Sequence, residues 1–345
     1  MKFVELPKVQ PGDRVAILSP SFAAPGIAPE VHEQALRRLA EVFDVVPVEY
    51  PTTRLVGASA ESRAADLHAA FADPSIKAIL ATIGGDDQIT VTRYLDPEIL
   101  KANPKPFIGY SDNTNLHNYL WRLGIPSYYG GSTQVHIGSG PAIDEIHLES
   151  LRAALSGGEI ELYEPGESED FGVNWVEPTA LTTFGEREPT EPWVWAGPER
   201  VIEGRTWGGC VSVLDQLAIA NQYPALDDLA GTVLLLESAE NLPSADEVMR
   251  IVRALGERGL LAKVAGVLVA RPPTSELFSP RPTAQERAEL RAAQRDVVIE
   301  QVKRYNPEAV VCVGVPFGHT RPQWIVPYGG TVRLDGLNQT VTAAY

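Results

Sequence analysis

The sequence contains few residues that could bind a metal or form disulfides. Only two cysteines, Cys210 and Cys312, occur among its 345 residues, each in an apolar stretch and neither in a C-x-x-C pattern. The six histidines form no H-E-x-x-H pair or similar spacing. Because metal sites need clustered ligands, nothing here indicates metal chemistry, and we expect two buried free thiols.

Positive charge is also scarce. Lysine and arginine number 29 against 45 aspartates and glutamates, which gives a formal net charge of −16. A protein that binds nucleic acid needs a basic stripe that displaces counterions from phosphates, and the sequence has none. We therefore expect no nucleic acid partner, although a small anionic ligand needs only a few local donors.

Long apolar runs are missing as well. No run approaches the roughly 18 residues of a membrane-spanning helix. The first eight residues lack the apolar core of a signal peptide. These absences predict a cytoplasmic protein without a membrane partner.

The first part of the chain alternates strand and helix patterns. Apolar runs typical of buried parallel strands occur at 13–20, 45–48 and 78–82, and helical spacing of apolar residues occurs at 29–43 and 61–71. Strand, helix, strand, helix implies right-handed crossovers. The pattern predicts an α/β fold with an open parallel sheet flanked by helices.

The composition changes after residue 158. Residues 159–200 are rich in Glu, Pro, Gly, Thr and Trp and lack apolar periodicity, which indicates a linker or a lid-like insert. Strand and helix patterns return in 201–345, where a helix at 284–305, dense in Arg and Glu, is expected to be a solvated face. We therefore predict an N-terminal α/β domain over 1–158, the insert, and a C-terminal β/α domain over 201–345.

Ser111 lies where a predicted strand runs directly into a predicted helix, within residues 105–120. A hydroxyl at such a turn is held out of the sheet, and the first helical amides, beginning with Asp112, point at an anion that forms beside it. This arrangement is a nucleophile elbow. The same residues could also be an ordinary Ser cap of a helix.

Two later strands end in side chains of complementary chemistry. Glu237 follows the apolar residues 233–236, and His319 follows a predicted strand at 310–315. A serine hydroxyl is a poor nucleophile unless a base takes its proton, and that base needs an acceptor to hold it in one tautomer. Ser111, Glu237 and His319 supply one group of each kind, although each alone could be structural.

Gly84 and Gly85 follow the strand at 78–82, at the sheet edge where ligands gather in open α/β folds. Without side chains, they allow backbone amides to approach a bound substrate, although two glycines could also simply form a tight turn. The first strand–helix unit lacks G-x-G-x-x-G, so a nicotinamide cofactor is not favoured.

Four short motifs lie at these strand ends: Thr82-Ile83-Gly84-Gly85-Asp86, Gly109-Tyr110-Ser111-Asp112, Leu236-Glu237-Ser238 and Gly318-His319-Thr320-Arg321-Pro322. Together they resemble the LD-carboxypeptidase and microcin C immunity peptidase family of serine peptidases. Any one of them would be weak, but jointly they are specific, and the match runs over nearly the whole chain.

The resemblance implies a Ser–Glu–His triad in which Ser111 is the nucleophile, His319 the general base and acid, and Glu237 the residue that orients the imidazole. It implies an oxyanion hole made by the backbone amides of Gly85 and Asp112. It also implies a C-terminal swivelling β/α domain, a catalytic site between the two domains, a homodimer, and no metal or organic cofactor.

The family divides by substrate. Immunity-type members cleave the amide that links an aminoacyl group to a toxic nucleotide analogue, whereas murein LD-carboxypeptidases cleave cell-wall tetrapeptides. Glu237 follows Ser111 by 126 positions, which resembles the longer spacing of the immunity type. Trp175, in the insert, resembles the tryptophan that stacks on the nucleobase there, although it could also be a hydrophobic plug.

The immunity type has a basic residue soon after the catalytic Glu, where this chain has Ala239-Glu240-Asn241. Our first hypothesis is hydrolysis of an aminoacyl-nucleotide, with Gly84 and Trp175 in contact with the substrate. The alternative within the family is murein tetrapeptide cleavage in cell-wall recycling. A third hypothesis, from another class, is a non-catalytic protein that binds a small ligand.

Overall fold

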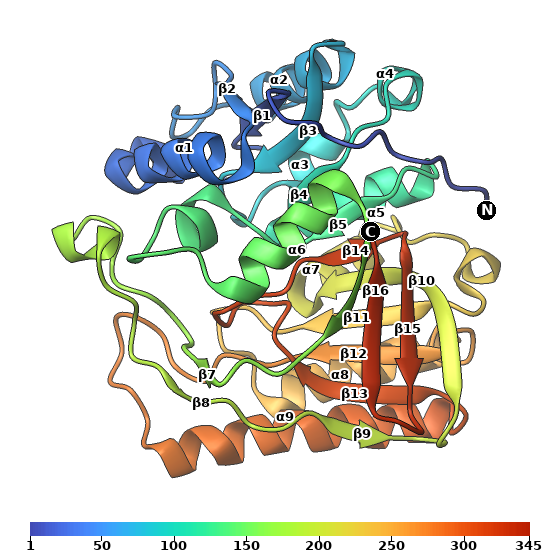
Figure 1. The fold of residues 1–345 in the computed structure, drawn as a ribbon. Coiled ribbons are helices and arrows are strands. Elements are labelled where there is room, and N and C mark those ends of the chain that lie inside the picture. Colours follow the sequence, from blue (N-terminus) through green and yellow to red (C-terminus); the bar gives the residue numbers. More distant parts are fainter.

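The computed structural model describes residues 1–345, which form two large β-sheets with helices around them (Figure 1). The N-terminal sheet has six strands in the order β14-β5-β4-β3-β1-β2. These strands are β1 (Arg14–Leu18), β2 (Val46–Glu49), β3 (Ile76–Ala81), β4 (Phe107–Gly109), β5 (Ser127–Tyr129) and β14 (Val326–Tyr328). All neighbours are parallel except β14 and β5, so the predicted open parallel sheet is confirmed.

Helices cover both faces of this sheet because its strands are apolar on both sides. Val15 and Ile17 of β1 share a buried cluster with residues of α1 (Pro29–Phe43) and α6 (Glu145–Ser156). Ala16 and Leu18, which point the other way, share a cluster with residues of α2 (Ala60–Ala72) and α5 (Thr114–Arg122). Two short helices, α3 (Ile89–Thr92) and α4 (Pro97–Ala102), complete this half.

The C-terminal sheet has eight strands in the order β6-β16-β15-β10-β11-β12-β13-β9. Its four central strands are parallel, and the outer ones pair antiparallel. The strands are β6 (Glu159–Leu162), β9 (Val194–Ala196), β10 (Val201–Cys210), β11 (Val233–Glu237), β12 (Gly266–Ala270), β13 (Val310–Val315), β15 (Thr331–Asp335) and β16 (Thr340–Ala344). Its helices are α7 (Val211–Ile219), α8 (Ala245–Glu257) and α9 (Ala284–Tyr305).

The chain returns to the first sheet near its end. After β13 in the C-terminal sheet, it crosses over and adds β14 to the edge of the N-terminal sheet, antiparallel to β5 (Figure 1). It then goes back to form β15 and β16. The loop between β13 and β14 is therefore anchored in one sheet at its beginning and in the other at its end.

The segment 159–200 contains short strands that its composition does not reveal. Its first strand, β6, and its last, β9, form the two outer edges of the C-terminal sheet. Between them, β7 (Glu167–Ser168) pairs with β8 (Glu188–Pro189), and the chain from 169 to 187 extends beyond this pair (Figure 1). Strands of two to four residues are too short to produce an apolar period.

A buried ion-pair network holds this segment against the C-terminal half. The side chain of Asp170 is 1% exposed, and its carboxylate lies 3.1 Å from both Arg271 and Arg291. It also accepts hydrogen bonds from the backbone amide of Thr274 and from the hydroxyl of Ser275. The prediction that α9 is a solvated face is therefore wrong for part of the helix, because Arg291 is buried against acidic residues of 159–200.

The structure contains neither a disulfide bond nor a helix that could span a membrane. Cys210 and Cys312 are both buried and unpaired, as predicted. No helix in the structure combines the length and the apolar character needed to cross a membrane.

Replacing Asp170 with Ala should destabilise the protein by about 3–5 kcal/mol, because it removes the most deeply buried of the carboxylates that pair with two buried arginines. Urea unfolding at constant m-value measures this loss, and proteolysis within 165–192 should become faster. Asp246→Ala is the control, since Asp246 forms an exposed pair with Arg250, and it should cost less than about 1 kcal/mol. Equal losses in the two variants would contradict the anchoring role of Asp170.

Candidate active site

Ser111 lies on a tight turn between β4 and α5, at the carboxyl edge of the N-terminal sheet. Its φ of 64° is in the left-handed region, which a non-glycine residue adopts only under constraint. The loop after β3 packs closely against this turn, since a Cβ on Gly84 would lie 2.8 Å from the Cβ of Ser111. Only glycine at position 84 allows the loop after β3 to approach the serine this closely.

Ser111, His319 and Glu237 form a continuous hydrogen-bonded series. The Nε2 atom of His319 lies 2.9 Å from the hydroxyl of Ser111, and its Nδ1 atom lies 2.7 Å from Oε2 of Glu237. The three residues come from different elements: the elbow, the end of β11 and the loop between β13 and β14. Gly318 lets this loop pass against Glu237, because a Cβ there would lie 2.9 Å from the Glu237 side chain.

Tyr129, at the end of β5, connects the carboxylate to the elbow. Its hydroxyl donates to Oε1 of Glu237 at 2.7 Å and accepts from the backbone amide of Ser111 at 3.2 Å. Glu237 is 1% exposed, so each of its oxygens needs a donor. His319 supplies one and Tyr129 the other. Sequence reasoning missed Tyr129, although its place at a strand end beside the elbow was a usable signal.

Asp112 holds the glycine loop in place. Its carboxylate accepts hydrogen bonds from the hydroxyl of Ser21 at 2.5 Å and from the amide of Gln88 at 2.8 Å. Burial raises the pKa of Asp112, although these hydrogen bonds act against the shift. The backbone amides of Gly85 and Asp112 donate to no group of the protein, so they can receive an anion beside Ser111.

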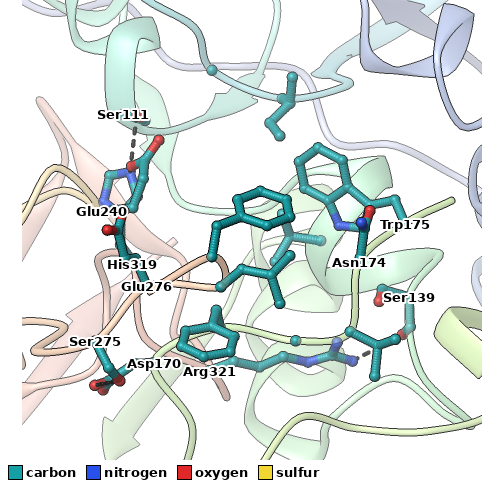
Figure 2. Close-up of a pocket in the computed structure, with 18 of the residues that line it drawn as sticks. Ser111, Ser139, Asp170, Asn174, Trp175, Glu240, Ser275, Glu276, His319 and Arg321 are labelled. Atoms are coloured by element: carbon teal, nitrogen blue, oxygen red, sulfur yellow. Dashed lines mark hydrogen bonds and ion pairs between the residues drawn. The ribbon is translucent and has the colours of Figure 1, made fainter. Parts of the chain in front are cut away.

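A cavity of about 470 Å³ opens beside the serine. Figure 2 shows Ser111, Glu240 and His319 together on one side and Asn174 and Trp175 across the cavity from them. Trp175 is half-buried, and it is the only tryptophan among the lining residues. Of the residues that the sequence singled out, Gly84, Gly85, Ser111, Trp175 and His319 line the cavity, whereas Glu237 and Asp112 lie behind its wall.

Glu240 adds a negative charge that sequence reasoning did not assign to the site. One of its carboxylate oxygens lies 2.9 Å from Nε2 of His319, the nitrogen that also contacts Ser111. Burial lowers the pKa of His319, but the carboxylates of Glu237 and Glu240 outweigh this effect and raise it to about 10. The hydrogen bond with His319 lowers the pKa of Glu240 to about 2.

Arg321 is the only arginine or lysine that lines the cavity. Its Nε atom donates to Asp144 at 2.7 Å and lies 3.8 Å from Glu169. Its charge is therefore balanced within the protein.

This arrangement can carry out acyl transfer. It combines a strained serine, an imidazole within reach of the serine, a buried carboxylate behind the imidazole and two unpaired backbone amides. With the two-sheet α/β fold, they define a class of serine hydrolases. The sequence matches two family models, the LD-carboxypeptidase N-terminal domain over residues 15–130 and the LD-carboxypeptidase C-terminal domain over residues 203–334. The chain belongs to this family of serine peptidases and is a carboxypeptidase of it.

Relatives cover most of the chain. A Streptomyces coelicolor protein provisionally named a carboxypeptidase is 36% identical over 97% of this chain and 94% of its own. The murein tetrapeptide carboxypeptidase of Pseudomonas aeruginosa is 27% identical over 95% of both chains. The microcin C7 self-immunity protein MccF of Escherichia coli is 25% identical over 82% of this chain and 78% of its own.

Solved structures share the fold. MccF in complex with glutamyl sulfamoyl guanosine has a TM-score of 0.83 at 21% identity, covering 99% of this chain and 98% of that one. An MccF-like protein from Streptococcus pneumoniae in complex with AMP has a TM-score of 0.81 at 24% identity, covering 97% and 99%.

Replacing Tyr129 with Phe should lower kcat/KM for the substrate that the wild type cleaves by about 10-fold or more, because the buried Glu237 loses a donor worth about 1–3 kcal/mol. Steady-state kinetics measures this loss. Tyr128→Phe is the matched control, since its hydroxyl, next along the same strand, makes no hydrogen bond to the site. Similar rates for Tyr129→Phe and Tyr128→Phe would show that Tyr129 does not hold Glu237.

Proposed function

We propose that this protein hydrolyses the amide that links an aminoacyl group to a nucleotide analogue, and so detoxifies antibiotics of the microcin C type. The observation that carries this proposal is Trp175, a half-buried indole across the cavity from Ser111. An indole face is a platform for a nucleobase, worth about 1–3 kcal/mol per stacked base. A cytoplasmic location and a homodimer belong to the same proposal.

In this mechanism, Ser111 Oγ attacks the scissile carbonyl carbon while His319 Nε2 takes the hydroxyl proton. The tetrahedral oxyanion receives hydrogen bonds from the backbone amides of Gly85 and Asp112. His319 then gives the proton to the leaving nitrogen, and the acyl group stays on Ser111 as an ester. A water molecule, deprotonated by His319, hydrolyses this ester and restores the serine.

Glu237 and Tyr129 act through His319. The carboxylate accepts the Nδ1–H of the imidazole, which fixes the tautomer and stabilises the imidazolium that forms during attack. Tyr129 keeps the carboxylate in the orientation that this hydrogen bond needs. No step requires a metal ion or an organic cofactor.

The nucleotide part of the proposal draws on ligands of related proteins. MccF has been crystallised with aspartyl sulfamoyl adenosine, and the Streptococcus pneumoniae protein with AMP. In this chain, Trp175 and Asn174 line the wall of the cavity that such a nucleoside would contact.

Cleavage of murein tetrapeptides is the second candidate function. The relative that favours it is the murein tetrapeptide carboxypeptidase of Pseudomonas aeruginosa, which matches over 95% of both chains. The non-catalytic alternative is set aside, because the chain belongs to a family of serine peptidases.

Turnover of two compounds in parallel, followed by mass spectrometry, tests the proposal. We expect wild type to cleave an aminoacyl sulfamoyl adenosine but not a murein tetrapeptide, and Ser111→Ala to lose about 10⁴-fold or more of this activity. Ser62→Ala, an exposed serine on α2, is the control and should stay active. Cleavage of the tetrapeptide alone would overturn the proposal in favour of the second candidate.

Replacing Trp175 with Ala should lower kcat/KM for the nucleotide compound by about 10- to 100-fold, since a stacked base contributes about 1–3 kcal/mol. Trp175→Phe keeps an aromatic face and should retain most of the activity. The matched control is an aminoacyl amide without a nucleoside, whose cleavage should not change. Equal losses on both compounds, or none on either, would contradict the role of Trp175 as a nucleobase platform.

A further inference from the structure

Glu240 is a carboxylate without a cationic partner other than His319. It lies in the loop after β11 and lines the cavity, and its side chain is 74% exposed. No lysine or arginine forms an ion pair with it. Because Arg321 is already paired with Asp144, the cavity wall beside Ser111 carries unbalanced negative charge.

The contact with Glu240 fixes the protonation state of the imidazole. Nδ1 of His319 donates its proton to Glu237, so a neutral imidazole would present only a lone pair at Nε2. A carboxylate oxygen 2.9 Å from that lone pair would be repelled. The arrangement therefore requires a proton on Nε2, and in this state His319 cannot accept the proton of Ser111.

The groups around His319 agree with this assignment. Glu237 and Glu240 supply negative charge from β11 and the loop after it, and Arg321 supplies a positive charge that is already paired. The ring of Tyr110 lies edge-on at 5.0 Å. His136, whose ring packs against Tyr110 at 5.3 Å, stays neutral because burial holds its pKa well below the usual value.

We propose that Glu240 binds the α-ammonium group of the substrate's acyl residue, and that this binding draws the carboxylate away from His319, so that Nε2 releases its proton to solvent and can act as the base. Glu240 is then a specificity residue for aminoacyl compounds. The inference rests on the proposed function, because it assumes that the scissile carbonyl belongs to a residue with a free amine.

Covalent geometry supports this placement. The α-nitrogen of an aminoacyl group is two bonds from the scissile carbonyl carbon, which must come within about 3–3.5 Å of the Ser111 hydroxyl. Glu240 and Ser111 are both within 2.9 Å of the same imidazole nitrogen. An ammonium group next to the reacting carbonyl is therefore close to the Glu240 carboxylate.

A peptide that is cleaved at its carboxyl end carries different charges near the scissile bond than an aminoacyl compound does. Its acyl residue is internal, so the α-nitrogen is an uncharged amide, and its leaving residue carries a free carboxylate. Glu240 repels that carboxylate and finds no ammonium near the scissile bond. The same side chain thus favours aminoacyl over peptidyl substrates.

The test compares alanyl sulfamoyl adenosine with its N-acetyl derivative, which differs only in the charge at the α-nitrogen. Wild type should prefer the free amine by 10-fold or more in kcat/KM. Glu240→Gln, which keeps the size of the side chain, should reduce this ratio to near one. Glu276→Gln is the matched control, since Glu276 also lines the cavity without contacting His319, and it should leave the ratio unchanged.

The pH dependence of kcat/KM distinguishes this role of Glu240 from a purely structural one, because a structural role would not change the midpoint of the profile. With the N-acetyl derivative, which has no amine to titrate, kcat/KM should rise with pH into the alkaline range, because His319 must lose its proton. Glu240→Gln removes one of the two carboxylates that hold this proton, so the midpoint should move toward neutral pH. An unchanged midpoint would overturn the release of His319 by the substrate.

The remaining outcomes separate this inference from the proposed function. If wild type cleaves both adenosine compounds equally well, or if Glu240→Gln keeps the wild-type ratio, the role of Glu240 is wrong and the proposed function stands. If wild type cleaves neither compound but cleaves a murein tetrapeptide, the proposed function fails and this inference fails with it.

Discussion

The carboxylate of Glu237 is the point at which the two halves of the molecule meet. It ends a strand of the C-terminal sheet and accepts hydrogen bonds from Tyr129 of the N-terminal sheet and from His319 of the loop between the sheets. A buried carboxylate is costly unless both oxygens are paired. The halves must therefore approach closely enough to pair it, and the same approach brings His319 to Ser111.

The parts of the fold that depend on local pattern could be predicted from the sequence. The strands at 13–20 and 78–82 and the helix at 29–43 are recognisable because parallel strands are continuous apolar runs and the helix has one apolar face. The elbow at Ser111 could be predicted for the same reason, as a strand that passes directly into a helix. Long-range pairing left no such signal, so β14 and the edge strands β6 and β9 were missed.

Charged residues were the hardest to interpret. Arg291 looked like part of a solvated helix because its burial depends on Asp170 and Glu191. These two residues lie 121 and 100 positions earlier in the chain, on a separate segment. Glu240 was noted only as standing where the immunity type has a basic residue, yet it contacts His319. In both cases the function of the charge is set by a partner from another element, which spacing along the chain does not reveal.

The return of the chain to the N-terminal sheet has a consequence for synthesis. Domains tend to fold in order as they leave the ribosome. Until residue 328 has emerged, β5 lacks its neighbour β14 and remains an open sheet edge, which is a template for wrong pairing. The same late segment carries His319. The nascent protein thus stays catalytically inactive until the segment that covers this edge has been synthesised.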